Sequence, residues 1–194
     1  MIPELTLSQQ IALMARNPLK QDELQKLIIA TLGNEDESTT AAVDARSVRS
    51  PLSKMRSRSP SALEVISKIA DEDLKIPLKN TSLGGFLLIT ATELSKTNII
   101  ENLLARKVHP DSSKGLAEPT SLAIATTNRD VAITTILLRH GANPNQAMQF
   151  GITPRQLAEK FAREGDSTMI ECFTKSVIAP REGERLSAET ARAK

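Results

Sequence analysis

Three segments of the chain align with one another at a spacing of 33–34 residues, and this internal repeat limits the folds that the sequence can form. Thr120 precedes Thr153 by 33 residues, and Leu103 precedes Leu137 by 34 residues. Such a period is typical of solenoids, in which each unit is too small to bury its own apolar face and gains stability by stacking on its neighbours. The period therefore predicts a stack of short helical units.

Local signals predict a pair of helices in each unit. Thr153 and Pro154 mark a helix start, because threonine caps a helix N-terminus and proline fits the first turn. Leu157 and Ala158 supply the packing face of that helix. Gly141 follows the last apolar residue of another helix, at a point where the chain must turn with a positive φ.

The chain from Leu137 to Asn145 reads Leu-Leu-Arg-His-Gly-Ala-Asn-Pro-Asn, and Gly-Ile-Thr-Pro follows at residues 151–154. These residues resemble the ankyrin repeat, whose pattern reads roughly G-x-T-P-L-H-L-A-A and then a helix ending in L-L-L-x-x-G-A-D-x-N. The resemblance covers about residues 61–178. It implies an all-α ankyrin-repeat solenoid of about three helix-turn-helix units with β-hairpin-like tips.

The repeats depart from the family pattern in several places. Phe86-Leu87 stands where Thr-Pro is usual, and Lys107-Val108-His109 stands where Gly-Ala-Asp is usual. The outer helix of this first repeat is therefore expected to end irregularly. Gly84-Gly85 is interpreted as a turn before the inner helix, since no G-K-[ST] follows it to form a phosphate cradle. The last repeat needs about three extra residues between Ala158 and Gly165, close to one helical turn.

Charge divides the rest of the chain. Residues 33–45 carry a net charge of −4 and residues 46–63 carry +5, with few apolar residues to bury. We interpret residues 33–60 as a flexible linker. It would separate an N-terminal piece from the ankyrin-repeat domain, residues 61–178, and residues 179–194 are predicted to be a polar tail.

Upstream of the repeats, residues 1–32 are predicted to form a helical hairpin. Thr6 and Gln9 match a capping box, and Asn17-Pro18 indicates the start of a second helix. Two short amphipathic helices are marginal alone, so the hairpin is expected to dock on the repeats, on a second copy of the chain or on a partner. Residues 61–72 are predicted to be the outer helix of an incomplete N-terminal repeat that caps the stack.

The sequence gives no positive support for catalysis. The chain has a net charge of +2, two histidines and one cysteine. His109 and His140 do not share a repeat position, and Cys172 is expected to be a small buried residue of an outer helix, whereas zinc needs three or four protein ligands. We therefore expect a protein that is not an enzyme and binds no metal and no cofactor.

Composition also argues against nucleic acid as a partner and against a transmembrane segment. Aromatic residues make up 2% of the chain, which leaves few rings for base stacking. No stretch of 18 uncharged apolar residues exists, so no transmembrane helix is predicted. The start Met1-Ile2-Pro3-Glu4 lacks the core of a secretory signal, and a cytoplasmic location is expected.

The resemblance implies where a protein partner would bind. In ankyrin-repeat proteins the partner usually lies across the hairpin tips and the concave face of the inner helices. At the tips, the matching positions are Ser112, Ser113, Lys114, Leu116, Ala147, Met148, Gln149, Phe150 and Ile152. On the inner-helix face they are Glu93, Thr126, Thr127 and Asn128. Met148, Phe150 and Ile152 form an apolar cluster, either a contact for the partner or covered by the fold.

The basic segment holds two candidate phosphorylation sites. Ser50 and Ser59 each follow an arginine and precede a proline, which suits basic-directed or proline-directed kinases. A phosphate would add close to −2 in charge and could create an adaptor-readable site. The segment could equally be a passive linker or contact a polyanion.

Three functions stay open at this point. The leading one is a cytoplasmic adaptor that binds a protein through the ankyrin groove and the hairpin tips. The second is a bacterial effector, delivered by a specialised secretion system into a host cell to bind or inhibit a host protein. Short divergent repeats, a Ser-rich segment and a Glu-containing polar tail are similar to such effectors. The third is a regulatory subunit or inhibitor of an enzyme. The identity of the partner and the oligomeric state are not determined by the sequence.

Overall fold

The computed structural model describes residues 5–33, 61–115, 118–147 and 151–178, and side chains up to residue 174. This part of the chain is mostly helical, as the all-α prediction requires, and its β-structure is limited to the isolated bridges Pro77–Ser82 and Ser113–Thr120. The predicted linker, the candidate sites Ser50 and Ser59, and the predicted tail all lie outside the described residues.

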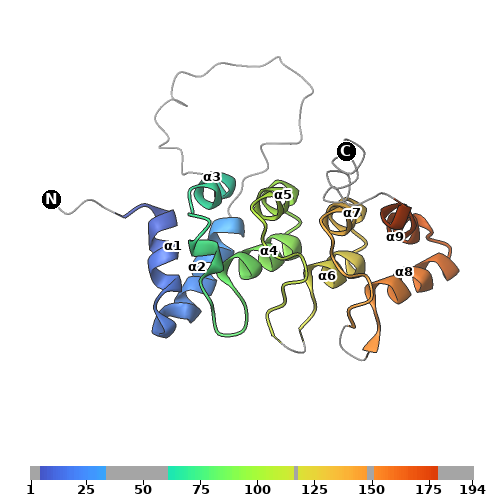
Figure 1. The fold of residues 1–194 in the computed structure, drawn as a ribbon, viewed down its shortest axis with the longest axis horizontal. Coiled ribbons are helices and arrows are strands. Elements are labelled where there is room, and N and C mark those ends of the chain that lie inside the picture. The colour runs from blue at the N-terminus through green and yellow to red at the C-terminus, as the bar shows by residue number, and fades with distance from the viewer. Residues whose placement is uncertain (1–4, 34–60, 116–117, 148–150, 179–194) are drawn as a thin grey trace, which may run out of the picture.

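Three helix pairs stack side by side in two rows (Figure 1). Inner helices contact inner helices of the next pair, and outer helices contact outer helices. The inner row contains α4 (Leu83–Glu93), α6 (Ser121–Thr127) and α8 (Pro154–Arg163). The outer row contains α5 (Thr97–Ala105), α7 (Val131–Arg139) and α9 (Thr168–Ile178).

The same turn joins the inner helix to the outer helix in all three pairs. One residue in each turn has a positive φ: 53° at Ser95, 57° at Arg129 and 102° at Gly165. The next backbone N–H then donates to a carbonyl five residues earlier, at 2.8–2.9 Å. This is the Schellman arrangement, which satisfies the last carbonyls of a helix. The turns therefore repeat even though their sequences differ.

The first outer helix ends regularly, so the prediction of an irregular end at Lys107 was wrong. Lys107 takes a φ of 61°, and Val108 N–H donates to Leu103 O at 3.1 Å. Gly141 ends the next outer helix in the same way with a φ of 87°. A lysine in this left-handed conformation costs roughly 1–2 kcal/mol more than a glycine, and the surrounding packing tolerates it.

The start of α4 lies four residues earlier than the sequence alignment indicated. Ser82 is its N-cap and accepts a hydrogen bond from Gly85 N at 3.1 Å, which is the role that Thr120 plays for α6. Phe86-Leu87 is therefore not the counterpart of Thr-Pro. The helix has 11 residues where α6 has 7, one extra turn.

Gly84 and Gly85 lie in the first turn of α4 and not in a turn before it. A Cβ at Gly85 would lie 2.6 Å from Thr81 Oγ1 and 2.8 Å from the Ser112 side chain. A Cβ at Gly84 would lie 2.9 Å from the Val108 side chain. The two glycines let neighbouring loops approach this helix closely, and no phosphate role is needed to explain them.

The predicted caps of other helices are present. Thr6 forms a capping box with Gln9 at the start of α1 (Leu7–Ala15), and Thr153 forms one with Gln156 at the start of α8. Asn17 caps a short 3-10 helix, η1 (Pro18–Lys20), which leads into α2 (Gln21–Gly33). The last inner helix has 10 residues, three more than α6, as its sequence required.

The N-terminal helices complete the two rows. Helix α2 contacts α4 in the inner row, and α3 (Ala62–Ser67) contacts α5 in the outer row, while α1 covers both α2 and α3. Arg106 holds α3 in place, because its guanidinium lies 2.5 Å from Asp71 Oδ1 and donates a hydrogen bond to Ile66 O at 2.9 Å. The structure thus places α2 at the end of the inner row and α3 at the end of the outer row, and residues 34–60 lie between them in the sequence.

One hydrophobic core joins all these elements, from Ile11 and Leu24 near the N-terminus to Phe173 in α9. Residues of α1 and α2 therefore pack into the same core as the repeats, which is the first of the three docking options given above for the hairpin. Helix α4 lies in the middle of this core, and all its residues except Glu93 are buried. Among the described helices, none is both long enough and apolar enough to cross a membrane.

Candidate protein-binding surface

Three loops project from one edge of the stack, below the inner row in Figure 1. They connect η3 (Asp73–Lys75) to α4, α5 to α6, and α7 to α8. Asp111 in the second loop accepts a hydrogen bond from Asn143 N in the third at 2.7 Å. On the other side, Gln21 accepts one from Lys79 N in the first loop at 3.0 Å. These loops and the adjacent ends of the inner helices are called the loop edge below.

Glu93 and Lys114, two residues predicted to face a partner, are paired with each other. Lys114 Nζ lies 2.6 and 2.7 Å from the two carboxylate oxygens of Glu93, and 5.6 Å from the centre of the Phe86 ring. The side chain of Lys114 is 31% exposed and that of Glu93 is 41% exposed. An ion pair this exposed contributes at most about 1 kcal/mol. It holds the second loop against the end of α4 and leaves both charges accessible from outside.

Ser112 and Ser113 shape the second loop and are only partly exposed. The Ser112 hydroxyl donates to His109 O at 2.7 Å, and the Ser113 hydroxyl donates to Gly115 O at 3.0 Å. Ser113 also forms the isolated bridge to Thr120. These contacts explain the conformation of the loop. Leu116, which is also predicted to contact a partner, lies outside the described residues.

The prediction that Thr126 lies on the binding face is wrong. Its side chain is fully buried, and its hydroxyl donates to Leu122 O at 2.8 Å. Thr127 and Asn128 follow it at the end of α6 and are exposed. The Thr127 hydroxyl donates to Ala123 O at 2.8 Å. The accessible part of α6 is therefore limited to the half-buried Ile124 and to the residues at the end of the helix.

The third loop is exposed where it is described. Ala147 and Ile152 are both exposed, and Ile152 has 46% of its surface accessible. Met148, Gln149 and Phe150 lie outside the described residues, so the choice between contact and covered core stays a prediction for Met148 and Phe150. Ile152 is thus an accessible apolar residue within the loop edge.

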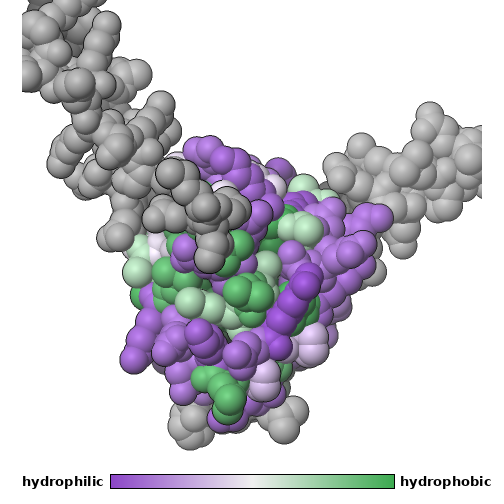
Figure 2. Space-filling view, turned by 90° about the vertical axis from the view of Figure 1, so that its left-hand side faces the viewer, coloured by the Kyte–Doolittle hydropathy of each residue, from purple (hydrophilic) through white to green (hydrophobic). Residues whose placement is uncertain are grey.

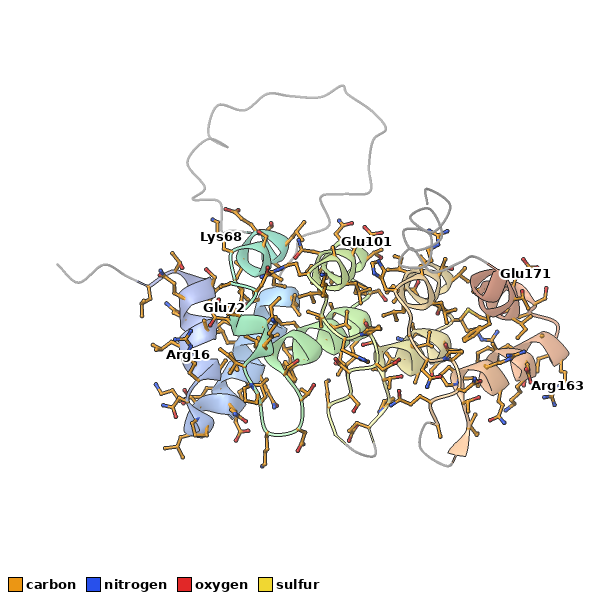
Figure 3. All side chains as sticks on the ribbon, viewed as in Figure 1. Arg16, Lys68, Glu72, Glu101, Arg163 and Glu171 are labelled. Carbon is orange, nitrogen blue, oxygen red and sulfur yellow. The ribbon has the colours of Figure 1, made fainter. Side chains whose placement is uncertain are left out.

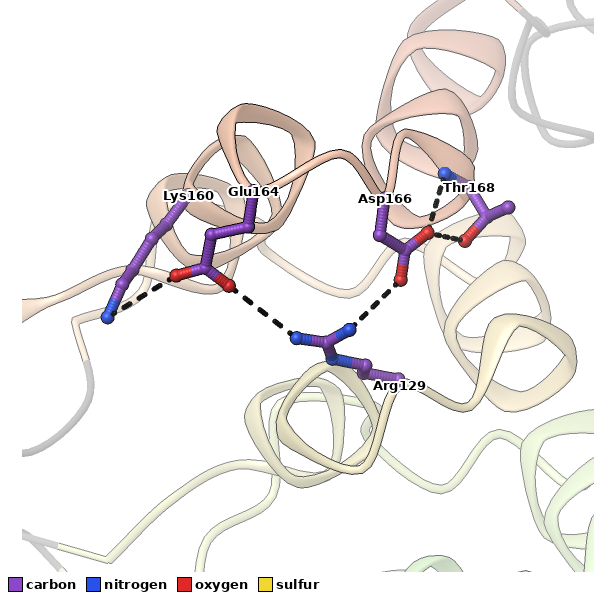
Figure 4. Close-up of polar contacts among 5 residues, drawn as sticks. All are labelled: Arg129, Lys160, Glu164, Asp166 and Thr168. Carbon is purple, nitrogen blue, oxygen red and sulfur yellow. Dashed lines mark hydrogen bonds and ion pairs between the residues drawn. The ribbon is translucent and has the colours of Figure 1, made fainter.

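A charged cluster around Arg129 was missed by the sequence analysis (Figure 4). Arg129 lies 3.6 Å from Glu164 and 3.3 Å from Asp166, and Lys160 reaches Glu164 at 4.0 Å. The Arg129 guanidinium also stacks over the Phe161 ring, 4.1 Å from its centre. Arg129 occupies the turn after α6, so this cluster ties the second pair to the third. Only the repeat alignment of Arg129 with Ser95 could have marked this position.

Asp166 is held in its charged form within this cluster. The Thr168 hydroxyl and the Thr168 backbone N–H donate to its carboxylate, and Arg129 adds a nearby positive charge. These contacts lower the pKa of Asp166 below its ordinary value of 3.8. The carboxylate of Asp166, in the turn between α8 and α9, therefore keeps its charge at neutral pH.

The opposite side of the stack is different. Lys68, Glu101 and Glu171 lie along the outer row, pointing away from the loops (Figure 3). They belong to separate helices and form no described contact with one another. Within the ranges described, no group of three His, Cys, Asp or Glu residues could hold a metal ion. The loop edge is therefore the surface where several predicted contact residues gather.

The chain matches no protein-family model, and no curated protein matches its sequence.

Proposed function

We propose that this chain is a non-enzymatic protein-interaction module of the ankyrin-repeat type. It binds one protein partner through the loop edge. The period of 33–34 residues, the pairing of helices in two rows and the recurrence of the same turn after each inner helix all support this interpretation. Binding modules of repeat proteins use loops that a rigid stack holds in a row.

The observation that carries the proposal is the connection between successive loops. The hydrogen bond from Asn143 N to Asp111 fixes the third loop to the second, and the Glu93–Lys114 pair fixes the second loop to α4. Loops held in this way lose little conformational freedom when a partner binds, which favours affinity.

The exposed groups indicate the chemistry of the partner. The loop edge presents both signs of charge, from Glu93 and Lys114 to Arg129 and Glu164, and adds the apolar Ile152. Such a surface suits a polar protein surface with an apolar anchor better than a uniformly charged polymer. The protein is proposed to act as an adaptor that recruits this partner.

Affinity capture with the full chain as bait, followed by mass spectrometry, identifies the partner. Two loop-edge variants then test the site: Ile152→Asp, and the double exchange Glu93→Lys with Lys114→Glu, which keeps an ion pair but inverts its direction. Each is expected to weaken binding by at least about tenfold.

Glu101→Lys is the matched control, because it changes an exposed charge on the outer row. Its affinity is expected to stay within about twofold of the original. A partner that binds all loop-edge variants normally, or that is lost with Glu101→Lys, would place the function elsewhere on the molecule.

A further inference from the structure

The N-terminal end of the stack carries an apolar depression on the outer side of α1. Leu5, Leu13 and Met14 line it together with Pro18 of η1, and its volume is about 720 Å³. Leu5 is 50% exposed and Leu13 is 60% exposed. Figure 2, which views the molecule from this end, shows hydrophobic residues gathered across the centre of the surface. This depression is called the end groove below.

Helix α1 has two apolar sides, and only one of them faces the stack. Ile11 is buried in the core. The lining residues Gln10, Leu13, Met14 and Asn17 form a second stripe, in which the later three follow Gln10 by three, four and seven positions. This is the spacing with which one α-helix packs against another. The last helix of a repeat stack normally presents a polar outer side, so an apolar stripe there suits one further helix.

The charged residues that line the end groove are both basic. Arg16 remains 67% exposed although its guanidinium lies 2.7 Å from Asp73 Oδ1, and a guanidinium has more N–H donors than one carboxylate oxygen occupies. Lys20 in η1 is exposed and forms no ion pair with a described residue. A ligand that brings carboxylates to this groove therefore gains charge-assisted contacts that a neutral or basic ligand lacks.

These charges distinguish between the occupants that an apolar groove can have. In a contact of groove with groove, a second copy of the chain would bring the same lining, which contains no carboxylate for Arg16 or Lys20. A purely apolar ligand would also leave both cations without a partner. A helix whose apolar side chains are flanked by carboxylates matches the stripe and the cations together, as charged flanking positions do in coiled coils.

We propose that the end groove binds an amphipathic, acidic helix of a partner protein. Its apolar side chains pack on Leu13 and Met14, and its carboxylates lie beside Arg16 and Lys20. The bound helix extends the stack by one element, as α1 itself does where it packs on α2 and α3.

The end groove adjoins the loop edge but is a different site. Gln21, next to Lys20 in the chain, accepts a hydrogen bond from Lys79 N of the first loop at 3.0 Å. The contacts proposed for the acidic helix nevertheless lie on α1 and η1, and their test changes no residue of the loop edge. The proposal therefore goes beyond the proposed function and stands or falls separately from it.

Two synthetic peptides test the proposal with the full chain. The first is a fluorescein-labelled helix of about three heptads, with leucine at positions a and d and glutamate at positions e and g. The second carries lysine in place of every glutamate. Fluorescence anisotropy is expected to give a dissociation constant between about 1 and about 100 µM for the glutamate peptide. The lysine peptide should bind at least about fivefold more weakly, because its charges meet Arg16 and Lys20.

Two variants test the residues of the groove. Leu13→Glu should weaken binding of the glutamate peptide by at least about tenfold. Lys20→Glu should weaken the glutamate peptide and strengthen the lysine peptide, each by about threefold, which a general loss of structure would not do. Val131→Glu is the matched control, since Val131 is an apolar residue of α7 that is 41% exposed, and both affinities should stay within about twofold. Circular dichroism should be unchanged, because all three side chains are exposed.

The absence of binding by the glutamate peptide up to about 1 mM overturns the proposal. Equal affinity for the two peptides, or loss of binding with Val131→Glu, also overturns it.

Two further measurements examine the other occupants. In sedimentation velocity, a dimer that Leu13→Glu dissociates would assign the groove to a second copy. Neutralising the four acidic residues between positions 33 and 45, Glu35, Asp36, Glu37 and Asp44, should leave the affinity for the glutamate peptide within about twofold. A rise of about tenfold or more would assign the groove to this segment of the same chain. Either assignment overturns the proposal.

Discussion

The α4–α5 pair and the α6–α7 pair have the same architecture but reach it with different residues. Helix α6 starts at a threonine cap, and the turn after α7 has its positive φ at Gly141, as the repeat pattern indicates. Helix α4 is capped one turn earlier by Ser82 and needs two glycines in its first turn, and the turn after α5 has its positive φ at Lys107. The packing of neighbours, more than the local sequence, thus maintains the first pair. That difference can be tested by substituting or removing the residues on which the conformation of each pair depends.

The largest effect is expected from removing residues 1–60, which takes away α2, the neighbour of α4 in the inner row. Leu24, Ile28 and Leu32 are fully buried, and each contributes about 1.5–3 kcal/mol by burial. Their sum is comparable to the total stability of a domain, about 5–15 kcal/mol. The fragment 61–194 is therefore expected to lose its cooperative thermal melt.

An engineered protease site within residues 34–60 is the control. The cut chain keeps every described contact between α2 and α4, so its two fragments are expected to co-elute in gel filtration with the melt nearly retained. A fragment 61–194 that melts like the full chain would show that residues 33–60 are a true boundary between domains.

The second effect concerns the glycines of α4. Gly85→Ala should reduce the free energy of unfolding by about 1–3 kcal/mol, because the added methyl group would overlap Thr81 and Ser112. Gly33→Ala is the matched control, since a Cβ there meets nothing within 4 Å. Urea unfolding measures both, and equal stability of the two variants would contradict the close approach at α4.

The third prediction compares the turn after α5 with the turn after α7. Lys107→Gly should stabilise the protein by about 1 kcal/mol, since glycine adopts a positive φ without the steric cost. Gly141→Ala should destabilise it by about 1 kcal/mol for the same reason. Thermal melts of the two variants should therefore move in opposite directions, and a shift of both in one direction would mean that the two turns are not equivalent.

The smallest effect concerns Asp166 in the Arg129 cluster. A lowered folded-state pKa means that the charged carboxylate adds stability above its unfolded pKa, and that this contribution is lost as the pH falls through the folded pKa. The melting temperature of Asp166→Asn should lie slightly below that of the original protein at pH 7. The gap should close below the ordinary value of 3.8, whereas a gap independent of pH would assign the difference to something other than charge.

The candidate surface was only partly predictable. The repeat pattern selected Glu93 and Lys114 correctly as accessible positions, but their mutual contact joins residues 21 apart and depends on how the loop folds back. Thr126 and Thr127 are adjacent threonines whose hydroxyls both donate to the carbonyl four residues earlier, yet Thr126 is buried and Thr127 is exposed. Whether a residue of a short helix faces the core or the solvent is decided by the neighbouring helices in the stack.

The sequence alone determined the helix caps at Thr6 and Thr153, the turn at Gly141 and the period of the stack, because these depend on residues a few positions apart. Only the tertiary structure decided that α2 extends the inner row and α3 the outer row, that Ser82 caps α4, and that Arg129 bridges two pairs. These features come from contacts between residues distant in the chain. Their free energy is shared among neighbouring helices, so no short stretch of sequence contains it.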